Sequence, residues 1–319
     1  FLAQHPKAKL LAVTTNGAGE TRCDPALRNI PALLALSDAN PVPFACGDDY
    51  PLDGFFAFPE PWRLQADTLS GVNIPTIDLN PAPGHAVELI HATLVAADQP
   101  VVLVATGSLT NIAQWLERYP QDRDKVDRLV IMGGAFEHKG NIIVPNFTDG
   151  HPNVSAEWNI FVDPLAAAQV FAAGLALEVV GLDVTNDVQV TAEFAAAFKR
   201  STPTPAARFW DQVLDDNDWF IASGEYYFWD VLAAIVALEP EFCQGTMEPA
   251  YVTVETTERP AFEDDSIPPT RIDGSKRRHL DPGRSGITRT GGNGPVVKVC
   301  RETSGDAALA LFADTLKRR

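Results

Sequence analysis

The sequence predicts an α/β fold, with a mostly parallel open sheet flanked by helices (a Rossmann-like core) and a more helical C-terminal half. Two observations predict this class. Short apolar runs typical of buried strands alternate with longer helical patterns over residues 10–185. Since neighbouring parallel strands need a crossover between them, this alternation indicates right-handed βαβ connections. The chain of 319 residues is 45% hydrophobic, which allows a sizeable core, and we expect a single domain over residues 1–319.

Apolar runs bounded by turn residues mark the expected strands. The first ends in Asn-Gly-Ala-Gly, a turn sequence, and the third ends in Gly133-Gly134. The predicted strands lie at residues 10–15, 101–107, 128–134, 175–185 and 295–300.

Helical spacing of apolar residues marks the segments between and after these strands. Pro164 in the first turn and Gly174 after the last bound one such helix. Residues 41–63 are predicted as a long loop and residues 257–296 as an excursion rich in Pro, Gly and charge. The expected helices lie at residues 26–36, 85–97, 109–120, 165–174, 191–200, 206–214, 228–240 and 306–319.

Composition excludes several classes of partner. A net charge of −17 disfavours nucleic acid and anionic membrane surfaces, and suits a neutral ligand or a cation better than a phosphate. No apolar run is long enough to span a membrane, so we expect a cytoplasmic protein. The four cysteines have no CxxC spacing, which predicts neither a zinc site nor a disulfide framework.

Polar residues follow the predicted strands at 16–20, 106–111, 133–141 and 183–186. In an open parallel sheet, ligands bind outside the carboxyl ends of the strands. The sequence therefore predicts that these segments converge on one edge of the sheet.

Within the stretch 141–164, two amides and one carboxylate are the residues of interest, namely Asn141, Glu157 and Asn159 around Trp158. Such groups can accept and donate hydrogen bonds to sugar hydroxyls. The alternative is a polar loop whose Asn and Asp side chains form turns.

Five motifs, which follow one another along the chain in the family's order, resemble the nucleoside hydrolase family. They are Gly-Asn at 140–141 followed by AEWNIFVDP at 156–164, ATGSLTNIA at 105–113, RLVIMGG at 128–134, GLDVTN at 181–186 and EYYFWDVLAA at 225–234. The resemblance implies hydrolysis of the N-glycosidic bond of ribonucleosides. It also implies that Asn141, Glu157 and Asn159 contact the ribose.

The resemblance further implies a calcium ion, Ca2+, with Asp230 as a side-chain ligand and Thr110 as a backbone-carbonyl ligand. Oxygen ligands suit this hard cation. Without the resemblance, Asp230 before an apolar run is equally typical of a helix N-cap. The family's opening acidic cluster, DxDxxxDD, which supplies the catalytic base, has no match here. We expect that the natural protein is longer, that the domain lacks its N-terminal strand, and that this chain holds no catalytic base.

Trp62 and Trp229 resemble the two tryptophans that stack on the base in the purine-specific branch. Trp229 stands where the mixed-specificity branch has a histidine that acts as a general acid. Trp residues are more often packing residues, which is the alternative for both. Glu20 falls near a family residue that contacts the sugar or base, and Asn16 is its rival. His138 and His151 are given no role.

The sequence thus predicts a purine nucleoside hydrolase with a small-molecule nucleoside substrate. The alternatives are a pyrimidine or mixed-specificity hydrolase, and a non-catalytic nucleoside-binding relative. A homo-oligomer is left open.

Overall fold

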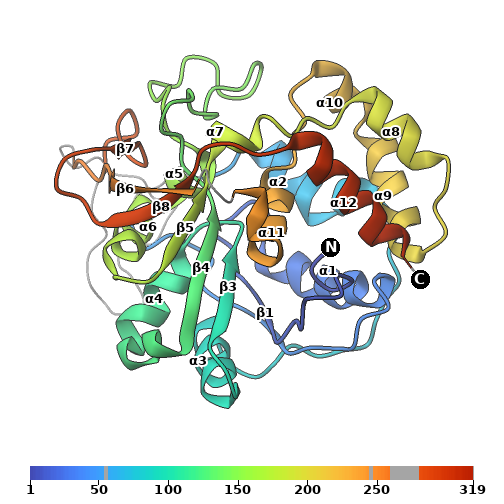
Figure 1. The fold of residues 1–319 in the computed structure, drawn as a ribbon, viewed down its shortest axis with the longest axis horizontal. Coiled ribbons are helices and arrows are strands. Elements are labelled where there is room, and N and C mark those ends of the chain that lie inside the picture. The colour runs from blue at the N-terminus through green and yellow to red at the C-terminus, as the bar shows by residue number, and fades with distance from the viewer. Residues whose placement is uncertain (54–56, 244–246, 259–279, 319) are drawn as a thin grey trace.

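A six-stranded sheet in the order β3-β4-β5-β8-β6-β7 forms the centre of the molecule (Figure 1). The computed structural model describes residues 1–319 except 54–56, 244–246, 259–279 and 319. Strands β3, β4, β5 and β8 pair in parallel, while β6 and β7 complete one edge in antiparallel pairing. The predicted α/β class with a mostly parallel sheet is confirmed. The bounds are β3 Val101–Ala105, β4 Val126–Met132, β5 Leu177–Val180, β6 Met247–Val254, β7 Thr288–Thr290 and β8 Val296–Cys300.

Helices cover both faces of this sheet. One face packs against α3 (Ala86–Ala96), α4 (Thr110–Arg118) and α6 (Pro164–Ala172). The other packs against α11 (Trp229–Leu238) and α12 (Gly305–Lys317), with α8 (Ala192–Lys199) and α9 (Pro205–Asp216) beyond them. The remaining helices are α1 Cys23–Leu36, α2 Glu60–Asp67, α5 Trp158–Val162, α7 Leu182–Thr185, α10 Asp218–Ser223, and the 3-10 turns Leu69–Gly71, Pro120–Lys125 and Pro240–Phe242. None of the helices in the described ranges is long and apolar enough to cross a membrane.

Strand β4 lies between two layers of helices, and its sequence reflects this position. Successive side chains of a strand point to opposite faces. Leu129 and Ile131 enter the core under α3, α4 and α6, whereas Val130 and Met132 enter the core under α11 and α12. All four are at most 2% exposed, which explains the continuous apolar run in the sequence.

Two predictions of local structure were wrong. Residues 41–63, predicted as a loop, contain β2 (Phe44–Cys46) and the start of α2, and β2 pairs in parallel with β1 (Val13–Thr15). The strand expected at 175–185 ends at Val180, because the N–H of Leu182 donates to the carbonyl of Gly134 (2.9 Å) and the chain turns into α7. Part of the excursion expected at 257–296 lies outside the described residues.

The expectation that the cysteines form no disulfides was also wrong. Cys23 pairs with Cys46 and Cys243 pairs with Cys300, so no cysteine is free. The β1–β2 pair brings the end of β2 beside the start of α1, and the antiparallel pairing of β6 with β8 brings the segment before β6 to Cys300. These are contacts between distant parts of the chain, which cysteine spacing does not report.

Candidate functional site

The loops after β3 and β4 meet at the carboxyl edge of the six-stranded sheet, and the loop after β1, a strand of the separate β1–β2 pair, joins them there as the sequence predicts. Asn16 follows β1, and its Oδ1 accepts a hydrogen bond from Ser108 Oγ (2.8 Å) in the loop after β3. Asn159, on α5, reaches both neighbouring strand ends, since its Nδ2 donates to the carbonyls of Met132 (3.2 Å) and Thr106 (3.4 Å). The loop after β5 joins them through α7, which stands at the end of β5 (Figure 1).

Glu157 is the N-cap of α5 and is almost fully buried. Its Oε1 accepts the N–H of Asn159 (2.9 Å), and its Oε2 accepts the N–H groups of Ile160 (3.2 Å) and Gly134 (3.1 Å). These bonds favour the ionised form, but desolvation outweighs them and raises the pKa of Glu157 to about 7. The carboxylate therefore fixes α5 to the Gly134 turn, while Oε1 retains one lone pair for a further donor.

Asn141 and Asn159 each use one polar group of the side-chain amide for a hydrogen bond to the protein backbone. Asn159 uses its Nδ2, as described above, and Asn141 uses its Oδ1 to accept the N–H of Trp158 (3.0 Å). Within the described residues, Asn159 Oδ1 and Asn141 Nδ2 have no protein hydrogen-bond partner. Asn141 and Glu157 thus bond to the local backbone, as the polar-loop alternative predicts. The amides of Asn141 and Asn159 nevertheless each keep one group for a ligand.

Asp230 lies close enough to two carboxylates from other elements, Glu20 and Glu157, for their charges to act on it. Asp230 has its pKa raised to about 8, mainly by desolvation and then by the negative charges of Glu20 and Glu157. Desolvation also raises the pKa of Glu20 to about 7. Both Asp230 and Glu20 retain exposed surface although protein surrounds them. Residues predicted from three distant motifs therefore act on one site, where burial and mutual repulsion favour the protonated forms of these carboxyl groups.

Asp230 is not the N-cap of α11, which removes the simplest structural alternative for it. The cap position belongs to Phe228, and Asp230 lies inside the first turn with no capping hydrogen bond. Its neighbour Trp229 is half-buried and donates its indole N–H to Asn186 Oδ1 (3.2 Å).

The two predicted tryptophans belong to different aromatic groups. Trp62, on α2, packs edge-on against Trp158 (ring centroids 5.8 Å apart) and near Phe147 (5.6 Å). Trp229 packs near the rings of Tyr227 (5.7 Å) and Phe220 (6.1 Å). No ring contact joins Trp62 to Trp229 among the described residues. Trp62 therefore lies next to α5, through its contact with Trp158, whereas Trp229 lies at the start of α11.

Thr110, the first residue of α4, is fully buried and its side chain is already engaged. Its hydroxyl donates to Asp163 Oδ2 (2.7 Å), which also accepts the N–H of Leu52 (2.8 Å). Asp163 additionally caps α6, and burial raises its pKa to about 6. Asp163 was not predicted as a site residue. The sequence feature that singles out Asp163 is its position immediately before Pro164, and this feature indicates the start of a helix rather than a functional residue.

Asp183 is a second residue that the sequence did not assign. Its carboxylate accepts three consecutive backbone N–H groups, from Phe136 (2.9 Å), Glu137 (2.6 Å) and His138 (3.0 Å). It therefore holds the loop after β4 against α7. Only its place after a predicted strand indicated that it could matter.

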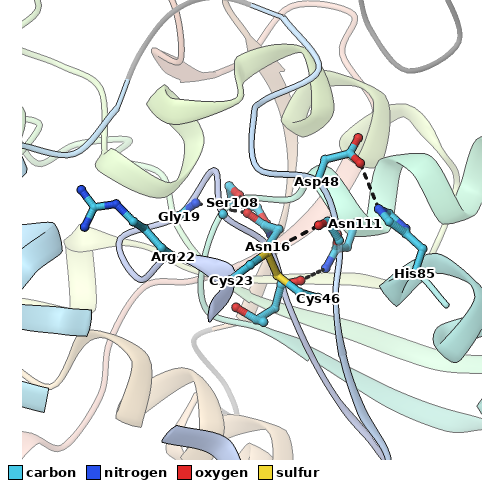
Figure 2. The surroundings of a disulfide bond; sticks show 12 residues. Asn16, Gly19, Arg22, Cys23, Cys46, Asp48, His85, Ser108 and Asn111 are labelled. Atoms are coloured by element: carbon cyan, nitrogen blue, oxygen red, sulfur yellow. Dashed lines mark hydrogen bonds and ion pairs between the residues drawn. A yellow bond between two sulfur atoms is a disulfide. The ribbon is translucent and has the colours of Figure 1, made fainter. Parts of the chain in front are cut away.

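A disulfide lies directly behind the loop that carries Glu20. Figure 2 shows Cys23 and Cys46 joined next to Asn16, with Asn111 nearby. Asn111 Nδ2 donates to the carbonyl of Thr15 (2.8 Å). A Cβ at Gly47 would lie 1.9 Å from Asn111 Oδ1, so this close approach requires glycine. The disulfide and the amide fix the carboxyl ends of β1 and β2.

The described residues fit the implied calcium ion only in part. Asp230 offers a carboxylate in a negatively charged surrounding, which a cation would neutralise. However, no group of three or more His, Cys, Asp or Glu side chains in the described ranges is placed to hold a metal ion. We derive no chemical step through a metal.

The fold and the site define an α/β protein whose polar side chains converge at the carboxyl edge of a parallel sheet. The family model for inosine-uridine preferring nucleoside hydrolases matches residues 1–310, and the chain belongs to this family.

Among curated relatives, the chain is 36% identical over 212 residues to the pyrimidine-specific ribonucleoside hydrolase RihA of Shewanella sp. (strain MR-7). That stretch is 66% of this chain and 62% of the relative. Two solved structures show the same fold. The inosine-uridine preferring nucleoside hydrolase of Bacillus anthracis gives a TM-score of 0.72 at 22% identity, covering 99% of this chain and 93% of that one. The purine-preferring ribonucleoside hydrolase of Gardnerella vaginalis gives a TM-score of 0.71 at 22% identity, covering 99% of this chain and 92% of that one.

Proposed function

We propose that the protein hydrolyses the N-glycosidic bond of ribonucleosides, as one domain over residues 1–319. Water forms a new bond to C1′ of the ribose, the bond from C1′ to the base nitrogen breaks, and the base leaves with a proton. The observation that supports this best is that Glu157, at the start of α5 with Asn159 two residues on, and Glu20 lie close enough to Asp230 for their charges to act on it. Family membership supports the same reaction.

In this proposal Asn141, Glu157 and Asn159 bind the sugar hydroxyls. Asn141 Nδ2, Asn159 Oδ1 and one lone pair of Glu157 Oε1 are the groups left for the substrate. Contacts accelerate cleavage only where they strengthen as positive charge develops on the ribose. A carboxylate held by backbone N–H groups is already in place and needs no reorganisation when that charge appears.

For the base we propose a purine, stacked on Trp229 and approached by Trp62. A purine offers two rings to these indoles, and each stacking partner contributes roughly 1–3 kcal/mol. A pyrimidine is the second candidate, because a curated relative 36% identical to this chain is named pyrimidine-specific. An acid for a pyrimidine leaving group would be missing, because Trp229 occupies the position before Asp230.

The test is ribose release from inosine and from uridine by the complete gene product. Preference for inosine, and loss of inosine turnover in Trp229→Ala with uridine turnover little changed, would support a purine hydrolase. Equal or better cleavage of uridine would favour the pyrimidine alternative. Inosine binding without release of ribose from either nucleoside would show a non-catalytic relative.

We also propose that Asp230 supplies a carboxylate to a bound calcium ion, with Thr110 contributing its carbonyl. Calcium content of the purified gene product should fall in Asp230→Ala and stay constant in Glu225→Ala, an exposed carboxylate of the same segment. Unchanged calcium in Asp230→Ala would exclude Asp230 as a ligand.

The compartment is a further proposal. The sequence suggested the cytoplasm, but two disulfides favour an oxidising compartment, because cytosolic thiols are kept reduced. Thiol labelling of acid-quenched cells decides between them, since a cytoplasmic protein would show four reactive thiols.

A further inference from the structure

Asn186 contacts Trp229 from a rigid part of the fold. It follows α7 as its C-cap, and its own N–H donates to the carbonyl of Leu182 (3.3 Å). Helix α7 is fixed in turn by Asp183, which holds the backbone of residues 136–138. The side chain of Asn186 is half-buried at the carboxyl edge of the sheet.

The two ends of the Asn186 amide have different partners. Its Oδ1 accepts the indole N–H of Trp229 (3.2 Å), and its Nδ2 lies 3.4 Å from Nε2 of His138. The other ring nitrogen of His138, Nδ1, is 2.6 Å from the carbonyl of Lys139 and therefore carries a proton. In the neutral imidazole Nε2 is then an acceptor, which turns the amide so that its oxygen faces Trp229.

The aromatic neighbours of Trp229 do not fix its ring plane in the same way. The nearby rings of Phe220, Tyr226 and Tyr227 are inclined to it by 33°, 45° and 62°. No described ring stacks face to face on the indole. Among the described residues, the hydrogen bond to Asn186 is the polar contact of the indole, and together with the edge-on ring of Tyr227 it sets the orientation of Trp229.

Helix α7, which carries Asn186, is also connected to Glu157, the carboxylate proposed to bind the sugar. The N–H of Gly134 donates to Glu157 Oε2 (3.1 Å), and the carbonyl of Gly134 accepts the N–H of Leu182 at the start of α7 (2.9 Å). Glu157 and Asn186 are therefore attached to one turn, through opposite groups of Gly134. This fixes the orientation of Trp229 relative to Glu157, the carboxylate proposed to bind the ribose.

We infer that Asn186 is a positioning residue for Trp229 that sets the preference of the site for the nucleoside base. The inference rests on the proposed function, in which Trp229 stacks on the base. Asn186 itself acts through the indole and touches no reacting atom.

Asn186→Leu keeps the approximate size of the side chain and removes the acceptor. In the complete gene product it should lower kcat/KM for inosine about fivefold, the equivalent of about 1 kcal/mol for one neutral hydrogen bond at 1.4 kcal/mol per tenfold, and change uridine less than twofold. Asn186→Asp keeps an acceptor for the indole and should restore most of the inosine activity. In Trp229→Phe, which has no N–H to donate, Asn186→Leu should leave the inosine to uridine ratio unchanged.

An equal effect of Asn186→Leu in the parent protein and in the Trp229→Phe variant would overturn the inference, because the residue would then act elsewhere. If Trp229→Ala itself leaves inosine turnover intact, the proposed stacking fails instead. A readout independent of activity is the indole N–H resonance of Trp229, identified among the six tryptophans by its loss in Trp229→Phe. Asn186→Leu should shift this resonance, and an unchanged resonance would refute the hydrogen bond.

Discussion

Removing the two disulfides one at a time tests whether they stabilise the fold through the loops they close. Cys23 and Cys46 are separated by 23 residues, and Cys243 and Cys300 by 57. A cross-link removes loop entropy from the unfolded chain by about 2.1 plus 1.5R ln n cal/mol/K. The expected losses are about 3.4 kcal/mol for Cys23→Ala/Cys46→Ala and about 4.2 kcal/mol for Cys243→Ala/Cys300→Ala. Alanine is preferred to serine because Cys243 and Cys300 are fully buried and a hydroxyl there would lack solvent.

The assay is scanning calorimetry of both variants beside the parent protein. At about 2.1 cal/mol/K per residue, the unfolding entropy of a chain of this length converts these losses into Tm decreases of about 5 and about 6 °C. The reasoning is refuted if the pair closing the shorter loop costs more stability than the pair closing the longer one. Only the first variant should also alter KM or kcat, because Cys23 adjoins the loop of Glu20, whereas Cys243 lies beyond the end of α11.

Three further predictions concern the site. Glu157→Gln and Asn159→Ala should each lower kcat by ~30- to 150-fold, the equivalent of about 2–3 kcal/mol for a contact made in the transition state, and an effect on KM alone would contradict this. Asp183→Asn should lower the unfolding free energy by about 2–4 kcal/mol in denaturant titrations, since three N–H groups lose a charged acceptor, while the exposed control Asp187→Asn should change it by less than about 0.5 kcal/mol. Because burial raises the pKa of Glu157 from 4.5 to about 7, the folded protein holds a proton that the unfolded chain releases, so stability should fall as pH rises from about 4.5 to about 7. Glu157→Gln should remove up to about 3 kcal/mol of that fall, and identical pH profiles would show that Glu157 titrates normally.

Local sequence patterns by themselves predicted the four parallel strands β3, β4, β5 and β8 and the helices beside them, but not the antiparallel strands β6 and β7. The apolar run at 128–134 predicted β4, and Pro164 and Gly174 correctly bounded α6, because periodicity, proline and glycine act within a few residues. The order of strands and loops also predicted that the segments 16–20, 106–111, 133–141 and 183–186 would meet at one edge, since parallel strands all end on the same side. Family motifs then added the candidate roles of Glu157, Asn159 and Asp230.

Only the tertiary structure decided which of these residues contact one another and in what environment. The pairing of Cys23 with Cys46 depends on two parallel strands, each three residues long, and a spacing of 23 residues does not encode it. The bond from Trp229 to Asn186 joins residues 43 positions apart, and the three N–H groups held by Asp183 lie 45 to 47 positions away. The raised pKa of Asp230 likewise arises from desolvation by the protein around it and from the charges of Glu20 and Glu157, which only the fold brings near it. Local propensity extends over a turn or a strand, whereas burial, charge coupling and disulfide partners depend on chain segments that meet only when the sheet is assembled.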